Sequence, residues 1–188
     1  MKRLLLLIFL LSAPFSGCIQ DENPERGFKG SETNVSVSAT KPPTVEELAK
    51  EIGKNPDEFL YPYDGFNYDS VTVSVEGDKI TVVAKVKGVP GEDVYLLVYE
   101  NGSLLLKSYL LEALPLSLKE RAISVAMSNE TIHENANGYV TVRRVLPHTA
   151  AKFYMPKELF SVTWHGDRIV SALVDLEEGR VVRVYVSE

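Results

Sequence analysis

The chain of 188 residues lacks several features that would define its chemistry. Cys18 is its only cysteine, so no disulfide bond can form within the chain. Basic residues are outnumbered, with 20 Lys and Arg against 26 Asp and Glu, which gives a net charge of −6. This sign argues against nucleic-acid binding, which requires cations that neutralise phosphates. Beyond the N-terminal region, no apolar run approaches the ~20 residues that a membrane-spanning helix needs.

Catalytic and cofactor motifs are missing too. The sequence contains no GxSxG elbow, P-loop, GxGxxG fingerprint or calcium loop. His133-Glu134 begins a run that falls short of the zinc-binding HExxH, because Asn137 stands in place of the second histidine and the run is expected to form a loop. His148 and His165 show no metal-ligand spacing. We predict a non-enzymatic protein without catalytic, cofactor or metal-binding residues; a hydrolase would need His and carboxylate side chains to meet in a cleft.

The N-terminus has the sequence pattern of an export signal. Lys2 and Arg3 precede an apolar run, Leu4 to Leu11, whose length is typical of a signal peptide. Phe15-Ser16-Gly17-Cys18 resembles the lipobox of prokaryotic lipoproteins, with Phe15 where leucine is more frequent. The resemblance implies removal of residues 1–17, lipidation of Cys18 and display on the outer face of the cytoplasmic membrane; the alternative is an unmodified thiol. Loss of the two basic residues would change the net charge from −6 to −8.

Residues 18–43 are expected to form the lipidated cysteine and a flexible tether. The segment after Cys18 has few large apolar side chains, so it cannot offset the entropy lost on ordering. A short extended piece at 35–39 is the only element expected there. Asn-X-Ser/Thr sequons begin at Asn34, Asn101 and Asn129, and they would be glycosylated only in a host with the machinery.

An aromatic segment, residues 59–68, follows a predicted first helix. Thr44 and Glu47 form a capping box, which predicts a helix over Val45–Lys54 that buries Leu48 and Ile52. The segment then places five aromatic residues among Pro62 and Gly65, which excludes a regular helix or strand. One interpretation is a ligand platform; the other, which we favour, is a set of rings that plug the end of a sheet. The candidate contacts of the platform are Tyr61, Tyr63, Phe66 and Tyr68.

Strand patterns fill most of the remaining chain. Alternating apolar residues predict four strands in two hairpins, over 71–75, 80–86, 94–99 and 104–110, with Asn101-Gly102 as a type I′ turn. A second capping box at Ser117 predicts a helix to about Ser128. Strands are expected over Tyr139–Val145 and Thr149–Tyr154, followed by a three-stranded meander over 159–186.

These patterns predict an α+β fold with two helices packed on antiparallel sheet. The boundaries expected are an N-terminal half at 44–114 and a C-terminal half at 115–188. Each half has a helix followed by strands, which suggests two diverged helix-plus-sheet units. The spacings between matching features disagree, so a strict repeat is excluded.

The C-terminal half resembles the PepSY family from roughly Pro115 to Val186. The resemblance is carried by the helix Leu118–Ala126, with its alanines, and by the final hairpin Val174–Val182, with an aspartate before a turn that ends in glycine. It implies an extracytoplasmic, non-catalytic module that binds or restrains another protein, in some cases a peptidase. We therefore expect a regulatory lipoprotein with a protein partner in the cell envelope. The alternative is a lipoprotein that binds a small ligand, glycan or peptide through Tyr61 to Tyr68.

Overall fold

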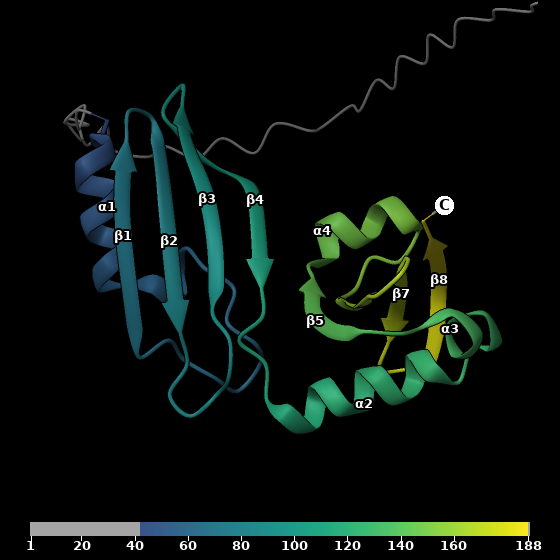
Figure 1. Ribbon diagram of the computed structural model, residues 1–188. Coiled ribbons are helices and arrows are strands. Elements are labelled where there is room, and N and C mark those ends of the chain that lie inside the picture. The colour runs from purple at the N-terminus through teal and green to yellow at the C-terminus, as the bar shows by residue number, and fades with distance from the viewer. Residues whose placement is uncertain (1–41, 188) are drawn as a thin grey trace, which may run out of the picture. The chain divides into compact units, whose positions relative to one another are not determined.

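The computed structural model describes residues Pro42–Ser187, which form two four-stranded antiparallel sheets with helices beside them (Figure 1). One sheet has the order β1-β2-β3-β4 and the other β5-β6-β7-β8, so every strand pairs with its neighbour in sequence. The predicted α+β class is confirmed. The sheets are larger than expected, and the two halves of the chain do not share one sheet.

The first half opens with α1, Val45–Lys54. The Thr44 hydroxyl accepts a hydrogen bond from the Glu47 amide at 3.2 Å, and the Glu47 carboxylate accepts one from the Thr44 amide at 2.8 Å. The predicted capping box is therefore confirmed. Ile52 is fully buried as expected, whereas Leu48 is only half-buried. The 3₁₀ helix η1, Pro56–Glu58, leads from α1 into the aromatic segment.

The first sheet comprises β1 (Ser70–Glu76), β2 (Lys79–Lys85), β3 (Asp93–Glu100) and β4 (Ser103–Leu111). Asn101 and Gly102 both have positive φ, 53° and 79°, as the predicted type I′ turn requires. Helix α1 packs on one face and encloses a core with the aliphatic residues of β2. Leu146, from the second half of the chain, belongs to the same core.

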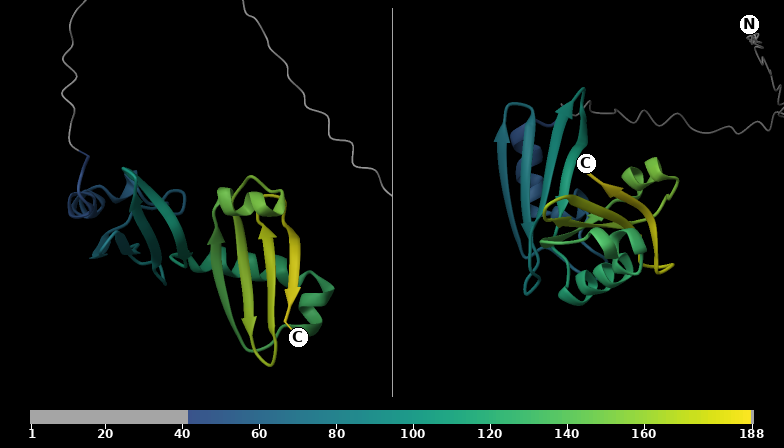
Figure 2. Two further views of the ribbon diagram at one scale, coloured as in Figure 1. Left: turned by 90° about the horizontal axis from the view of Figure 1, so that it is seen from above. Right: turned by 45° about the vertical axis from the view of Figure 1, so that its right-hand side comes forward.

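The second half begins with α2 (Leu116–Met127) and α3 (Glu130–Asn135), followed by β5 (Tyr139–Val145). Helix α4 (Pro147–Ala150) and the 3₁₀ helix η2 (Ala151–Phe153) precede β6 (Leu159–His165), β7 (Ile169–Asp175) and β8 (Arg180–Val186). Helix α2 passes along one face of this sheet (Figure 2). Its Ala122 and Ala126 are fully buried there, in a core shared with Val162, Val170 and Ala172.

Three local predictions in the second half are wrong. The N-cap of α2 is Pro115 and makes no side-chain hydrogen bond; Ser117 lies inside the first turn and is not the cap. The segment Thr149–Tyr154 is not a strand, because Pro147 stands at the start of α4, where its fixed φ favours a helix. His133-Glu134 lies in α3 rather than in a loop, because the Asn129 side chain caps this helix.

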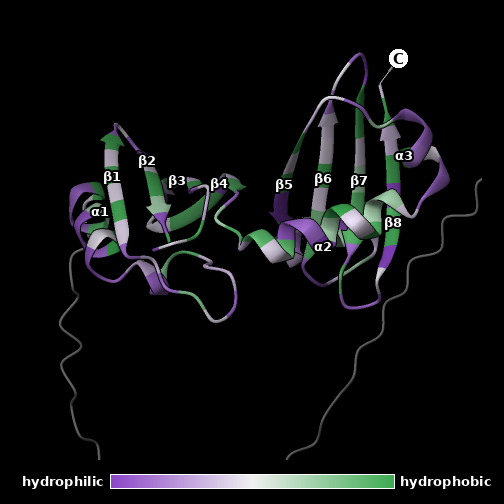
Figure 3. Cartoon of the chain, turned by 60° about the horizontal axis from the view of Figure 1, so that its bottom comes forward, coloured by the Kyte–Doolittle hydropathy of each residue, from purple (hydrophilic) through white to green (hydrophobic). Residues whose placement is uncertain are grey.

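Hydrophobic residues recur along the strands of both sheets, but the end of β5 is strongly hydrophilic (Figure 3). Arg143 and Arg144 occupy this end, and Arg144 is only 4% exposed. A buried arginine is costly unless its charge and donors find partners. The surroundings of Arg144 therefore lead to the candidate site. Between Pro42 and Ser187, no helix is both long enough and apolar enough to cross a bilayer.

Candidate functional site

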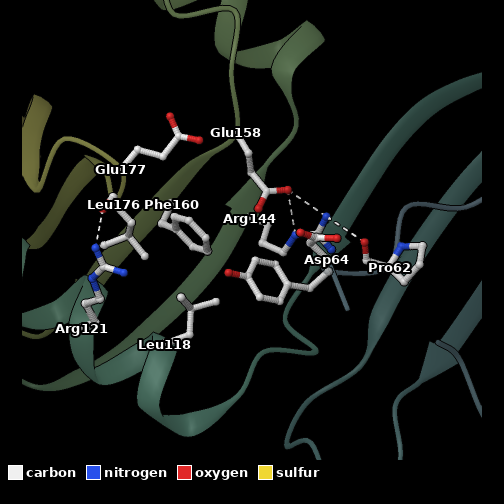
Figure 4. Close-up of a pocket in the computed structure, with 10 residues that line it drawn as sticks. Pro62, Asp64, Leu118, Arg121, Arg144, Glu158, Phe160, Leu176 and Glu177 are labelled. Atoms are coloured by element: carbon white, nitrogen blue, oxygen red, sulfur yellow. Dashed lines mark hydrogen bonds and ion pairs between the residues drawn. The ribbon is translucent and has the colours of Figure 1, made fainter. Parts of the chain in front are cut away.

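A cleft of about 500 Å³ lies between the aromatic segment, α2 and the strands β5 and β6 (Figure 4). Its apolar lining consists of Pro62, Tyr63, Leu118, Phe160 and Leu176. Its charged lining consists of Asp64, Arg121, Arg144, Glu158 and Glu177. The cleft thus combines an apolar floor with charges of both signs.

Arg144 ties the aromatic segment to β5. Its Nε and Nη2 donate to the Glu158 carboxylate at 3.0 and 2.8 Å, and its Nη1 donates to the Tyr61 carbonyl at 2.8 Å. Its Nη2 also lies 3.4 Å from the Pro62 carbonyl oxygen. The guanidinium carbon stands 5.5 Å from the centre of the Tyr63 ring, within cation–π range. These contacts hold one wall of the cleft in a fixed position.

A buried polar network backs this wall. The Asp93 carboxylate accepts hydrogen bonds from the Ala113 amide at 2.8 Å and the Tyr68 hydroxyl at 2.6 Å, and it lies 3.9 Å from Arg144 Nη1. The hydroxyls of Tyr68 and Tyr95 are 2.6 Å apart. Every charged or hydroxyl group of the network therefore has a partner, as buried polar groups require.

Burial shifts the pKa values of this network. Desolvation raises the pKa of Asp93, although its hydrogen bonds and the charge of Arg144 act in the opposite direction. Desolvation also raises the pKa of Tyr68, and it raises the pKa of Tyr95 to about 12. Both phenols therefore stay protonated at neutral pH and act as hydrogen-bond donors.

The floor and rim of the cleft differ in burial and charge. Phe160 is buried and meets Tyr63 edge to face, with ring centres 6.4 Å apart. On the rim, Arg121 donates to the Leu176 carbonyl at 2.6 Å. The rim carboxylates Asp64 and Glu177 are exposed. No cation between Pro42 and Ser187 forms an ion pair with Asp64, whereas Glu177 lies 3.4 Å from the Lys157 ammonium. The rim therefore offers one arginine and two carboxylates to a ligand.

The structure separates the four aromatic residues singled out in the sequence. Tyr63 lines the cleft, whereas Tyr68 is held in the buried network. Tyr61 is 47% exposed but is not part of the lining, and Phe66 is half-buried 6.1 Å from the Tyr63 ring. The four rings thus do not form one platform, although Tyr63 remains available as a predicted ligand contact.

Sequence reasoning missed the charged residues of the cleft. Arg144 and Glu158 lie 14 positions apart and meet only because β5 pairs with β6. Arg121 lies on α2 and reaches the carbonyl of Leu176, the residue that follows β7. The one signal available was the Arg143-Arg144 pair at the end of an apolar strand, since alternation places one of two neighbouring strand residues on the buried face.

The candidate modification sites have different settings. Asn101 is exposed at its turn. Asn129 is half-buried, and its side chain accepts a hydrogen bond from the Ile132 amide at 3.3 Å. Cys18 and Asn34 lie outside the described residues, as do the expected signal peptide, almost all of the tether and the extended piece at 35–39.

The three histidines lie apart from the cleft. His133 is in α3, the ring of His148 meets Tyr109 at 5.9 Å, and His165 stacks on Tyr139 at 4.5 Å. Within Pro42–Ser187, no three His, Cys, Asp or Glu side chains are grouped as metal ligands. The chain matches no protein-family model, and searches of curated proteins and of solved structures find no match either.

Proposed function

We propose that this protein is a non-catalytic binding module that holds a segment of a partner protein in the cleft. The observation that carries the proposal is the combination of a fixed apolar floor with exposed, weakly paired carboxylates on the rim. Recognition sites commonly pair an apolar pocket with a few oriented polar groups. The PepSY-like C-terminal half supports the same class of function.

The chemistry of the cleft defines the segment it would hold. Leu118, Phe160 and Tyr63 offer apolar contact to one aliphatic or aromatic side chain. Asp64 and Glu177 would attract a lysine or arginine beside that side chain, because charge complementarity favours opposite signs. Arg144 is not free for this purpose, since Glu158 and two carbonyls already occupy its donors. We therefore propose a partner segment with an apolar residue next to a basic one.

The setting of this module is the cell envelope. Lys2, Arg3 and the apolar run support export, and the lipobox-like sequence at Cys18 supports a lipid anchor. We propose that the protein is held on the outer face of the cytoplasmic membrane and acts there on an envelope protein, with a peptidase as the leading candidate. Its acidic charge fits a basic partner segment and argues against nucleic acid.

A second candidate function uses the same cleft for a small solute, glycan or peptide. The volume favours it, because about 500 Å³ lies within the range of small-molecule sites. Tyr63 would then supply the aromatic surface. The first candidate function predicts a bound protein and the second a bound small molecule. Crosslinking can distinguish them by the mass of the adduct.

The test is site-specific photocrosslinking in the native host. A photoreactive amino acid at Asp64, on the rim, should yield a discrete protein adduct that mass spectrometry identifies. The same amino acid at Glu134, an exposed residue of α3, serves as the matched control and should yield none. Glu177→Lys should abolish the adduct at position 64. Adducts of equal yield at both positions would contradict the proposal, and a small-molecule adduct alone would favour the second candidate.

The same preparation tests the anchor. The mass of the peptide that begins at Cys18 should include the lipid, and the protein should fractionate with membranes. An unmodified Cys18 in the soluble fraction would contradict the localisation but not the cleft.

A further inference from the structure

A second pocket, of about 390 Å³, lies between β4 and β5. These are edge strands of their respective sheets. Two contacts hold them together beside the pocket. The Leu146 amide donates to the Tyr109 hydroxyl at 3.0 Å, and Arg143 Nε pairs with Glu112 at 2.7 Å. The strands that build the pocket are thus held in fixed positions. On β6, Ser161 lines this pocket and the neighbouring Phe160 lines the cleft, because successive strand residues point to opposite faces.

The charge of this pocket is opposite to that of the protein as a whole. Lys107, Arg143 and Lys152 line it, together with the ion-paired Arg144, and its lining includes no carboxylate. The complete chain has 26 acidic and 20 basic residues. A cluster of cations within an acidic protein concentrates anions locally.

Much of this positive charge is available to a ligand. Lys152 is exposed and forms no ion pair with any residue between Pro42 and Ser187. Lys107 makes only a solvent-exposed pair with Glu100, at 3.4 Å, and such pairs contribute little. Arg143 uses Nε for Glu112, so its two terminal nitrogens can still donate.

Hydroxyl donors complete the lining. Ser108, Thr149 and Ser161 line the pocket. In the described part of the chain, none of their hydroxyls is hydrogen-bonded to another side chain or backbone group. Three cations and three free hydroxyls provide many donors around one space. A tetrahedral oxyanion accepts more hydrogen bonds than a carboxylate does, so it matches this set of donors better.

We propose that the pocket between β4 and β5 binds a phosphate group. Lys152 and Arg143 would supply the charge, and Ser161 and its neighbouring hydroxyls would orient the oxygens. This site shares only Arg144 with the partner-binding cleft, and it needs no partner protein. The phosphate could belong to a soluble ester or to a lipid headgroup, since both present anionic phosphate oxygens that accept hydrogen bonds.

The test is titration of the full-length protein, in a non-ionic detergent at low ionic strength, with inorganic phosphate followed by calorimetry. Binding should saturate at one site per chain. Lys152→Glu should weaken it by about tenfold or more, because a charge-assisted hydrogen bond is lost. Ser161→Ala should weaken it a few-fold. Lys50→Glu, at an exposed lysine of α1, changes the net charge equally and should leave the affinity unaltered.

Binding that never saturates, or equal losses in Lys152→Glu and Lys50→Glu, would overturn the proposal, because either result means diffuse attraction. Nanodiscs of phosphatidylcholine with and without phosphatidylglycerol identify the source of the phosphate. Competition between phosphatidylglycerol and inorganic phosphate, abolished by Lys152→Glu, would assign the site to a headgroup. Retained phosphate binding without competition would assign it to a soluble phosphate ester.

Discussion

Replacing Arg144 with methionine should destabilise the protein strongly. Methionine has a similar length, so the change removes the charge and the donors more than the volume. It removes the only donor to the Pro62 carbonyl in the described part of the chain and one of the two donors to the Tyr61 carbonyl, which keeps the Tyr95 hydroxyl at 3.1 Å. It also leaves the buried Asp93 without a nearby cation. Breaking a buried ion pair from one side costs about 3–5 kcal/mol. We expect the free energy of unfolding to fall by that amount.

Arg143→Met is the matched control, because it removes the same group one position away on β5. The Arg143 side chain is 40% exposed and its pair with Glu112 is open to solvent. Such a pair contributes less than about 1 kcal/mol. Urea unfolding of both variants can be followed through Trp164, the only tryptophan, which is 6% exposed. Equal stability of the two variants would refute the role assigned to Arg144.

The loss in Arg144→Met should also depend on pH. Burial already raises the pKa of Asp93 above 3.8 in the folded protein, and removal of the guanidinium should raise it further. A raised folded-state pKa means that the ionised carboxylate costs stability at neutral pH, and that this cost disappears as the pH falls through that pKa. The difference between Arg144→Met and the unmodified protein should therefore shrink toward pH 4. A constant difference would show that Asp93 does not sense Arg144.

Three further predictions concern the cap, a turn and acid stability. Thr44→Ala should cost about 1 kcal/mol in urea unfolding, whereas Ser117→Ala, which removes no cap, should stay within about 0.5 kcal/mol. Gly138→Ala should cost more than about 2 kcal/mol of stability, because its Cβ would collide with the carbonyl of His165. Gly77→Ala has open space around the new Cβ and should cost about 1 kcal/mol for its positive φ. Equal thermal midpoints of the two variants would contradict this prediction. Burial alone would raise the pKa of Asp175, but hydrogen bonds from a lysine and two amides lower this pKa overall. The ionised Asp175 therefore stabilises the folded protein above pH 3.8, and this stabilisation is lost as the pH falls through the lowered pKa. Asp175→Asn should flatten the dependence of thermal midpoint on pH in that acid range.

The strands were predictable because their signals are local. Alternation and a glycine at each reversal placed the hairpins within one or two residues, since each strand pairs with its neighbour in sequence. The capping signal at Ser117 misled because the motif takes no account of Pro115, which sets the first turn. The helical turns after Pro147 are short, and their few residues carry no reliable period.

The cleft was not predictable, because it depends on contacts between distant segments. Arg144 bonds carbonyls more than 80 positions away, at Tyr61 and Pro62. The sequence around Arg144, and that around Tyr61 and Pro62, contains no local pattern that predicts this contact. The aromatic segment could be recognised as unusual, but only the neighbouring β6 decides that Tyr63 faces the cleft and meets Phe160. The PepSY resemblance, the lipid anchor and the absence of enzymatic activity remain predictions.

The pairing of Asp93 with Arg144 has a consequence for the order in which the protein folds. The N-terminal half emerges first, from the ribosome or from the membrane during export, so the first sheet can form while β5 is still missing. At that stage Asp93 would have to be buried without its cation, and the core of the first half would lack Leu146. A truncated chain that ends before Arg144 therefore has both a hole and an unpaired charge in its interior. The interior of the first half is thus complete only when the second half is present.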